Sequence, residues 1–315
     1  MIELEFSKFF TKRTITIIIA SALFYAVFSL ISDIQQISNK FASIDIFYIP
    51  LILCFHFLAM GIRSIRQKVF FDSLNIKLSI SQNIKLYFAG MALMVTPGGS
   101  GELIKNHILK EKFGHSYTKT IPVLLTEKYH NMLSVIPILF IFLMFRESKE
   151  ILIITSVIAI ILFCIFLIIK NQKLCLNTMS KIPRKWILKE IPDNASSFYD
   201  SLLILFKGKT FFFGTGIGIL AWLADAVAIY FCFLAFDLNF DFIYTTLTNF
   251  APMIVGTILF IPGGLGVTEL GMTGLLLQSG VVISTASALV LFIRFMITWS
   301  TVIAGIIALK LAKFD

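Results

Sequence analysis

A short glycine-rich motif occurs twice within otherwise apolar segments of this chain. The first copy spans residues 96–102 (TPGGSGE) and the second spans residues 261–269 (IPGGLGVTE). Proline and clustered glycines destabilise a helix interior by about 1–3 kcal/mol each, so both copies predict a broken helix. Lipid offers no water to the backbone groups that a break frees, so such backbone must line a protein-enclosed cavity. Paired breaks in the two halves of a chain point to a transporter binding site.

The remainder of the chain predicts an all-α integral membrane protein. Hydrophobic residues make up 57% of its 315 residues, and the mean hydropathy is +0.90. Apolar runs long enough to cross a hydrocarbon core of about 30 Å cover residues 14–31, 46–62, 121–145, 151–169, 211–236 and 285–309. The broken segments lie between these runs, at about 82–112 and 242–280. No polar stretch is long enough to fold alone, so we expect a single membrane domain over residues 1–315.

Lysine and arginine in the short loops set the expected orientation. Basic residues gather before residue 14, after residue 62, over residues 170–209 and at the C-terminus. This places both termini in the cytoplasm if each broken segment returns to the side it entered from, or if both segments cross. We read the linker 170–209 as a solvated cytoplasmic orientation signal, with an interfacial helix as the alternative.

The spacing of charged residues favours an inverted repeat. Glu102 lies 25 residues before Glu127, and Glu269 lies 25 residues before Arg294, so each second residue falls in the next long helix. Two re-entrant copies of opposite topology would give this pattern, and a chance match in an apolar chain is the alternative. The repeats are expected over about 46–169 and 211–309.

The first break is expected to form an anion-binding helix end. Gly98, Gly99 and Gly101 allow close approach to the backbone. A helix starting near Gly101 places Glu102 in its first turn and Lys105 one turn further. Its free N–H groups and positive dipole end can hold a phosphate, while Glu102 can cap the terminus, hold a cation or accept a proton. A purely structural re-entrant turn is the alternative.

The second break follows the same logic. Gly263, Gly264 and Gly266 loosen the backbone, and Thr268 is expected to be the N-cap before Glu269. Two helix N-termini that enter from opposite faces would meet near the midplane. One anionic headgroup, or its counter-ions, would bind there.

Several charged residues lie inside apolar helices, namely Glu127, Lys128, Asp225 and Arg294. Burying such groups alone in hydrocarbon costs several kcal/mol, so they should face the bundle and form pairs. We expect Arg294 to pair with Glu269 or Asp225, or to bind a phosphate directly. A structural ion pair between helices is the alternative.

Other polar features favour packing roles. His56 and His130 lie in apolar runs and are expected to be packing histidines, although His130 could relay protons. Gly214 and Gly218 form a small-xxx-small face, which is typical of helix packing.

The sequence predicts neither an enzyme nor a bound cofactor or metal. It contains no CxxC, HExxH or GxSxG motif and no Walker loop. The net charge of +9 is explained by the cytoplasmic loops, so no nucleic-acid partner is expected.

At these residues the chain resembles the lysylphosphatidylglycerol synthase transmembrane-region family. The motifs that carry the resemblance are TPGxxGExxK at 96–105, EKxxN at 127–131, PGGLGVxE at 262–269, and Arg294. The resemblance covers nearly the whole chain. The family includes the flippase half of the multiple peptide resistance factors and stand-alone membrane proteins, some linked to archaeal or bacterial glycosylation.

The chain departs from the family pattern in two respects. The family usually has Glu-Arg-x-x-Asp where this chain has Glu127, Lys128 and Asn131, so the positive charge is kept and one carboxylate is lost. That loss argues against a proton or cation role at residue 131. The aminoacyl-transferase domain of the two-part synthases is also absent, so the resemblance does not imply a complete lysyl-lipid synthase.

Together these features predict a polytopic transmembrane helical bundle in the cell membrane, with two broken helix pairs in an inverted repeat. We expect it to move or bind a phosphate-bearing lipid, such as an anionic phospholipid or a polyprenyl-phosphate carrier. The alternatives are a small-solute or ion transporter, a membrane-embedded transferase, and a non-catalytic partner of a glycosyltransferase or lipid synthase. The expected substrate-binding residues are Gly98, Gly99, Gly101, Glu102, Lys105, Glu127, Lys128, Asp225, Gly263, Gly264, Gly266, Thr268, Glu269 and Arg294.

Overall fold

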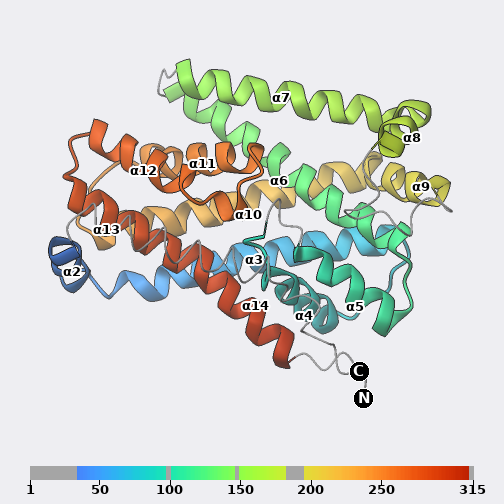
Figure 1. The fold of residues 1–315 in the computed structure, drawn as a ribbon, viewed down its shortest axis with the longest axis horizontal. Helices are drawn as coiled ribbons and strands as arrows, with labels where there is room; N and C mark the ends of the chain where they lie inside the picture. Colours follow the sequence, from blue (N-terminus) through green and yellow to red (C-terminus); the bar gives the residue numbers. More distant parts are fainter. Residues whose placement is uncertain (1–33, 97–100, 146–148, 182–194, 312–315) are drawn as a thin grey trace. The chain divides into compact units, whose positions relative to one another are not determined.

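A computed structural model describes residues 34–96, 101–145, 149–181 and 195–311. Within these residues the regular structure is helical throughout (Figure 1). The α-helices are α2 (Ile34–Ala42), α3 (Tyr48–Ser73), α4 (Ile80–Met91), α5 (Ile104–Phe113), α6 (Tyr117–Phe145), α7 (Lys149–Lys170), α8 (Gln172–Lys181), α9 (Ala195–Leu205), α10 (Gly208–Ala235), α11 (Phe242–Ile258), α12 (Val267–Gln278), α13 (Ile283–Ile293) and α14 (Ser300–Leu311). A short 3₁₀ turn lies at Pro262–Gly264, and a π-helical segment at Arg294–Trp299 joins α13 to α14.

Five described helices are long and apolar enough to cross a membrane. They are Tyr48–Ser73, Tyr117–Phe145, Leu152–Lys170, Gly208–Ala235 and Ile283–Leu311. These helices confirm the predicted all-α polytopic class and the runs from 46–62 onwards. The run predicted over 14–31 lies outside the described residues.

The first of these helices, α3, extends well beyond the predicted end at residue 62. Arg63, Arg66 and Lys68 follow the apolar run, but they do not stop the helix because arginine and lysine are good helix formers. Polar side chains that the sequence suggested for a loop therefore lie on a helix.

The two broken segments are also present as predicted. Helices α4 and α5 are separated within the segment 82–112, and α11 and α12 within the segment 242–280. Whether the breaks belong to an inverted repeat over 46–169 and 211–309 stays a prediction, as does the cytoplasmic position of the termini.

The chain forms two compact units. Unit 1 takes its described residues from Met1–Phe57, Gly90–Ile104 and Ala224–Ile307, and unit 2 from Leu58–Ala89, Lys105–Leu223 and Ala308–Asp315. Helices α3 and α10 each contribute one part to either unit.

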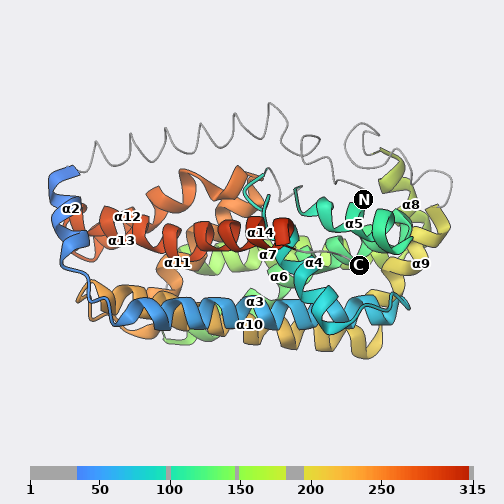
Figure 2. The ribbon, with the colours of Figure 1, turned by 90° about the horizontal axis from the view of Figure 1, so that it is seen from below.

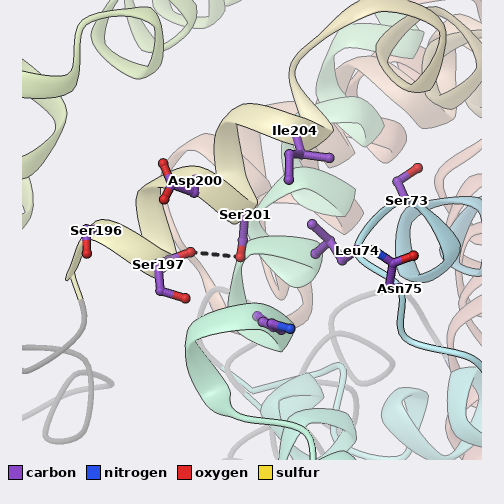
Figure 3. Close-up of a pocket in the computed structure, with 9 residues that line it drawn as sticks. Ser73, Leu74, Asn75, Ser196, Ser197, Asp200, Ser201 and Ile204 are labelled. Carbon is purple, nitrogen blue, oxygen red and sulfur yellow. Dashed lines mark hydrogen bonds between the residues drawn. The ribbon is translucent and has the colours of Figure 1, made fainter.

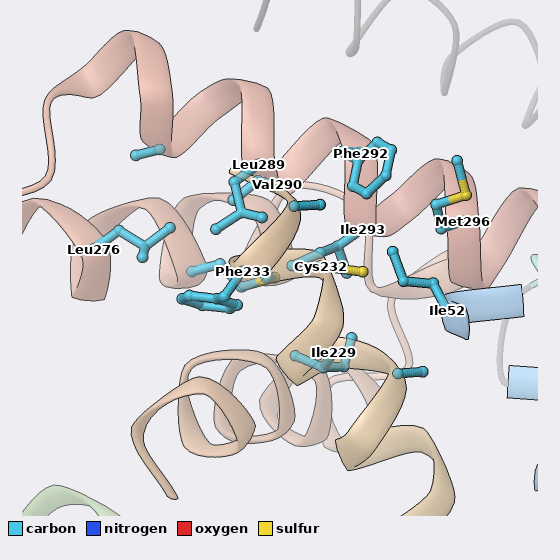
Figure 4. Close-up of a cluster of buried hydrophobic side chains, with 14 residues drawn as sticks. Ile52, Ile229, Cys232, Phe233, Leu276, Leu289, Val290, Phe292, Ile293 and Met296 are labelled. Atoms are coloured by element: carbon cyan, nitrogen blue, oxygen red, sulfur yellow. The ribbon is translucent and has the colours of Figure 1, made fainter. Parts of the chain in front are cut away.

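Unit 1 is built around a cluster of buried apolar side chains from α3, α10, α12 and α13 (Figure 4). Ile52, Phe233 and Leu289 are fully or almost fully buried in it. Helices α11 and α12 pack as a hairpin, and α2 lies against α13 (Figure 2). In lipid such contacts hold helices together by close packing, because the hydrocarbon is as apolar as the side chains.

Unit 2 packs α6 against α7 and α9. Glycines of α10 permit close contact within it: a Cβ at Gly214 would meet the Phe70 ring at 2.7 Å, and a Cβ at Gly218 would overlap Ser134. The packing role predicted for these two glycines is therefore confirmed.

The linker 170–209 contains more structure than a solvated orientation signal. It holds α8 and α9, and α9 buries Phe198, Leu202 and Leu205 against its neighbours. The spacing of these apolar residues at i, i+4 and i+7 explains why α9 packs rather than remaining solvated. Residues 182–194 lie outside the described residues.

A cavity of about 300 Å³ lies in unit 2 where the end of α3 approaches α9 (Figure 3). Most of the residues that line it are polar, and they include Ser196, Ser197 and Asp200 of α9, together with Asn75. Asp200 is exposed and the described part of the cavity holds no buried unpartnered group, so it resembles a solvated surface hollow.

Candidate functional site

The second break depends on backbone conformations that favour glycine. Gly263, Gly264 and Gly266 have φ angles of 58°, 66° and 83°. A non-glycine residue in this left-handed region costs about 1–2 kcal/mol, so these glycines let the chain turn from α11 into α12. Phe260, which follows the end of α11, occupies the same region with φ 54°. The predicted role of these glycines in shaping the break is consistent with this geometry.

Helix α12 begins with Gly266 as its N-cap rather than with Thr268. The Gly266 N–H donates to Glu269 Oε2 at 2.7 Å. An N-cap residue needs a non-helical backbone, which Gly266 has, whereas Thr268 is already the second residue of the helix. The predicted cap was therefore wrong. The buried Oγ1 of Thr268 makes no hydrogen bond within the described residues.

Arg294 closes the second break from the end of α13. Its Nε donates to Glu269 Oε1 at 2.7 Å, and its Nη2 donates to the Gly263 carbonyl at 2.5 Å. The side chains of Arg294 and Glu269 are 7% and 0% exposed. The Arg294 guanidinium thus binds both the Glu269 carboxylate, which caps α12, and the Gly263 carbonyl, which precedes that helix. Of the two carboxylates predicted as partners of Arg294, Glu269 is the one with which it pairs.

The first break is held by Thr96. Its Oγ1 accepts from the Gly101 N–H at 2.6 Å and donates to the Leu93 carbonyl at 2.8 Å. A Cβ at Gly101 would overlap Leu93, so the chain needs glycine there. Glu102 is buried at the start of the turn that leads into α5, as the sequence suggested. Gly98 and Gly99 lie outside the described residues.

The two breaks touch within unit 1. A Cβ at Gly263 would lie 3.6 Å from the side chain of Val95, which is ordinary van der Waals contact. The two motifs that the sequence shows far apart are therefore neighbours. This is the arrangement expected if both line one cavity.

In unit 2, Lys105 pairs with Glu127. Lys105 Nζ lies 2.7 Å from Glu127 Oε2 and 3.1 Å from Gln67 Oε1, and it lies over the ring of Tyr87. The side chains of Lys105 and Glu127 are 2% and 5% exposed. Glu127 Oε1 is buried and has no hydrogen-bond partner among the described residues. Two predicted site residues are thus joined, although the sequence did not pair them.

A polar shell around Lys105 went unnoticed at the level of sequence. Gln67 Nε2 donates to Asn83 Oδ1 at 3.0 Å, and Asn83 Nδ2 donates to the Ser64 carbonyl at 2.8 Å. Arg66 Nη2 donates to Asn131 Oδ1 at 2.5 Å. A helix predicted to continue past residue 62 would have placed residues 64–67 on the bundle, because they belong to α3 and not to a loop.

Asp225 also finds a partner, but not Arg294. His56 Nδ1 lies 3.0 Å from Asp225 Oδ1, and His56 Nε2 lies 2.7 Å from Thr301 Oγ1. The prediction that Asp225 pairs inside the bundle is confirmed, while the interpretation of His56 as a packing residue was incomplete. His130 does lie among aromatic rings, with Nδ1 3.1 Å from Thr215 Oγ1.

The predicted site residues therefore gather in three buried clusters. Unit 1 holds the Arg294–Glu269 pair at the second break and the His56–Asp225 pair, and unit 2 holds the Lys105–Glu127 pair. Lys128 is only partly buried. No group of three or more His, Cys, Asp or Glu residues that could hold a metal ion occurs in the described ranges.

Interrupted apolar helices and ion pairs buried between them define a polytopic α-helical membrane protein with an internal polar site. Residues 17–305 match the family model described as the lysylphosphatidylglycerol synthase TM region, and the chain belongs to this family.

Two archaeal relatives are similar over most of their length. The chain is 27% identical over 299 residues to the UPF0104 membrane protein PH1989 of Pyrococcus horikoshii, which covers 85% of this chain and 88% of the relative. It is also 27% identical over 222 residues to the UPF0104 membrane protein MJ1078 of Methanocaldococcus jannaschii, covering 68% of this chain and 90% of the relative.

Proposed function

We propose that this protein binds a phosphate-bearing lipid, such as an anionic phospholipid or a polyprenyl-phosphate carrier, and moves it across the cell membrane. The observation that carries the proposal is the buried guanidinium of Arg294 at a helix break, where it binds the Glu269 carboxylate and the Gly263 carbonyl. A guanidinium binds phosphate and carboxylate oxygens with the same planar fork, so a lipid phosphate suits this position.

In this proposal the headgroup exchanges with a carboxylate. Two of the buried cations, Arg294 and Lys105, are already neutralised by a glutamate. A phosphate entering either cluster must displace the carboxylate from its cation, because a second uncompensated negative charge in a low-dielectric site costs several kcal/mol. This competition with a carboxylate lowers the affinity for the lipid phosphate. A low affinity suits a transporter, because a transporter must release its substrate.

The family membership supports the same substrate class. The family is described by a transmembrane region of a lysylphosphatidylglycerol synthase, so at least one member is named for a phosphate-bearing lipid. The protein is proposed to be a transporter rather than an enzyme, with membrane lipids as its partners.

Native mass spectrometry of the purified protein with its co-purified lipids tests the proposal. The informative variant is Glu269→Gln/Arg294→Gln, which removes both charges and leaves neutral amides that can still hydrogen-bond. We expect wild type to retain an anionic lipid selectively, and the double variant to retain about 10–100-fold less, as expected for the loss of charged hydrogen bonds of about 1.5–3 kcal/mol.

Lys68→Gln is the matched control, because Lys68 forms an exposed ion pair with Asp72 on α3. It should retain as much lipid as wild type. Folded wild-type protein that binds no anionic lipid, or a double variant that binds it unchanged, would sink the proposal. Solute uptake that does not depend on headgroup would favour a solute transporter instead. A partner of a glycosyltransferase would keep its activity in Glu102→Gln and Glu269→Gln variants.

A further inference from the structure

Three helices of unit 1 bring together a buried histidine, a buried aspartate and a buried threonine. His56 lies on α3, Asp225 on α10 and Thr301 on α14, and all three lie inside helices that are long and apolar enough to cross a membrane. Their residues are 4%, 7% and 4% exposed. Ionisable groups are costly in hydrocarbon, so such a trio inside a bundle requires an explanation beyond packing.

The hydrogen-bond geometry accommodates two protonation states. Thr301 Oγ1 lies 2.7 Å from His56 Nε2 and also 2.7 Å from the Ile297 carbonyl, but its single proton can serve one of them at a time. If the hydroxyl donates to Nε2, then Nδ1–H donates to the Asp225 carboxylate, and the ring is neutral.

If the hydroxyl instead donates to the Ile297 carbonyl, as threonines in helices often do, Nε2 must carry its own proton and donate to Thr301 Oγ1. The ring is then an imidazolium paired with Asp225. Between the two states one proton is gained at Nε2, the hydroxyl rotates, and the net charge of the trio changes from −1 to 0. Every donor and acceptor in these bonds keeps a partner in both states, and no heavy atom needs to move.

The apolar cluster of unit 1, which is drawn in Figure 4, includes a residue about one helical turn from each member of the trio. Ile52 precedes His56 by one helical turn, Ile229 follows Asp225 by one turn, and Met296 lies just over one turn before Thr301; all three belong to the cluster. The trio is therefore flanked on three helices by buried apolar side chains.

Unit 1 holds other ionisable groups besides the trio. Arg294 and Glu269 form their own pair. The other ionisable or charged side chains among the described residues of unit 1 are Lys40, Asp45, Tyr48, Cys54, Glu102, Tyr230, Cys232, Asp237, Asp241 and Tyr244.

We propose that His56, Asp225 and Thr301 form a proton-binding site that couples proton movement to the lipid movement proposed above. The inference rests on that function and names its coupling ion. A proton that crosses with a singly charged anionic lipid makes the step electroneutral, which avoids moving net charge through hydrocarbon.

Solid-state ¹⁵N NMR of histidine-labelled protein in lipid bilayers tests the proton site directly, without any transport substrate. The ring nitrogens have different shifts in the neutral and imidazolium forms, and His56→Gln assigns the signal by removing it. We expect the His56 signal to pass between the two forms over the pH range in which the protein stays folded. Asp225→Asn, which keeps size and hydrogen-bonding capacity, is expected to abolish the change. A His56 ring that holds one form throughout this range in wild type would overturn the proposal.

If His56→Gln fails to fold, substitution of His107, His115 and His130 assigns the same signal by elimination, because the chain has four histidines. The wild-type measurement therefore remains decisive.

A transport measurement then tests the coupling. Proteoliposomes of phosphatidylcholine and phosphatidylglycerol carry a trace of fluorescent phosphatidylglycerol, a pH gradient of one unit and a clamped membrane potential. One proton per lipid predicts a leaflet ratio of about tenfold for wild type, and a ratio of about one for His56→Gln. Lipid that moves in wild type without responding to the gradient would overturn the coupling and leave lipid transport intact. A ring that changes protonation while no lipid moves would overturn the proposed function and the coupling, but not the proton site.

Discussion

Replacing Arg294 by glutamine removes the guanidinium that neutralises Glu269 in the core of unit 1. Glu269 is completely buried and lies 2.7 Å from Arg294 Nε, and Arg294 Nη2 is a donor to the Gly263 carbonyl. Removing one member of a buried ion pair costs about 3–5 kcal/mol, because the remaining charge stays uncompensated. The weakened bond to Gly263 adds about 1 kcal/mol. We therefore expect Arg294→Gln to lower the free energy of unfolding by about 4–6 kcal/mol.

The double variant Glu269→Gln/Arg294→Gln should be more stable than the single one. It leaves two glutamine side chains, which are neutral, so no buried charge remains. Their amides can hydrogen-bond to each other and to the Gly266 N–H. Replacing a whole buried pair often costs little. We expect a loss of at most about 2 kcal/mol, and therefore a coupling energy of at least about 2 kcal/mol in the double-mutant cycle.

Unfolding of the purified protein by sodium dodecyl sulfate, followed by tryptophan fluorescence, measures these differences. Lys68→Gln is the control, since an exposed i,i+4 pair contributes about 0–1 kcal/mol. The reasoning is refuted if Arg294→Gln loses less than about 1 kcal/mol, or if the double variant loses as much as the two single variants added together.

Three further predictions concern packing, backbone strain and titration. Gly218→Ala should destabilise unit 2 by about 1–3 kcal/mol, because its Cβ would overlap Ser134. Gly216→Ala on the same helix is the control, since a Cβ at Gly216 would have no atom within 4 Å, and it should be neutral or slightly stabilising in the same unfolding assay. Phe260→Gly should stabilise the protein by about 1 kcal/mol, since it relieves a left-handed φ of 54° at an exposed side chain; unchanged or lower stability would contradict this. Burial and then the Lys119 charge lower the pKa of His115 below 6.5, so protonating it disfavours the folded state as the pH falls below 6.5. Lys119→Gln should raise the pKa of His115 in an NMR titration and reduce this loss of stability, and an unchanged pKa would rule out the charge as a cause.

Local properties of the sequence were enough to predict the class of fold. The length and apolarity of a run decide whether it can span a membrane, and the structure has helices at five of the predicted runs. The Pro-Gly-Gly motifs predicted both breaks because proline and glycine act on their own backbone. That Arg294 would find a buried partner was also predictable, because a buried charge must be compensated, but the sequence left Glu269 and Asp225 both open.

Tertiary structure decided which partners the other buried groups take. His56 meets Asp225 and Thr301, which are 169 and 245 residues away in the chain, and Lys105 meets Gln67 and Glu127. No spacing rule within one helix can relate residues so far apart, because their approach depends on how whole helices pack.

The N-cap of α12 shows that tertiary structure can also decide a feature that involves only neighbouring residues. The sequence favoured Thr268 by residue type, but the cap is Gly266 because that residue has the backbone angles that the end of the helix requires. Those angles follow from how the chain turns between α11 and α12, where Arg294 binds the Gly263 carbonyl. Hydrophobic length and helix breaks are local and can be read from the sequence, whereas helix caps and the choice of partner for each buried charge depend on contacts that only the folded chain creates.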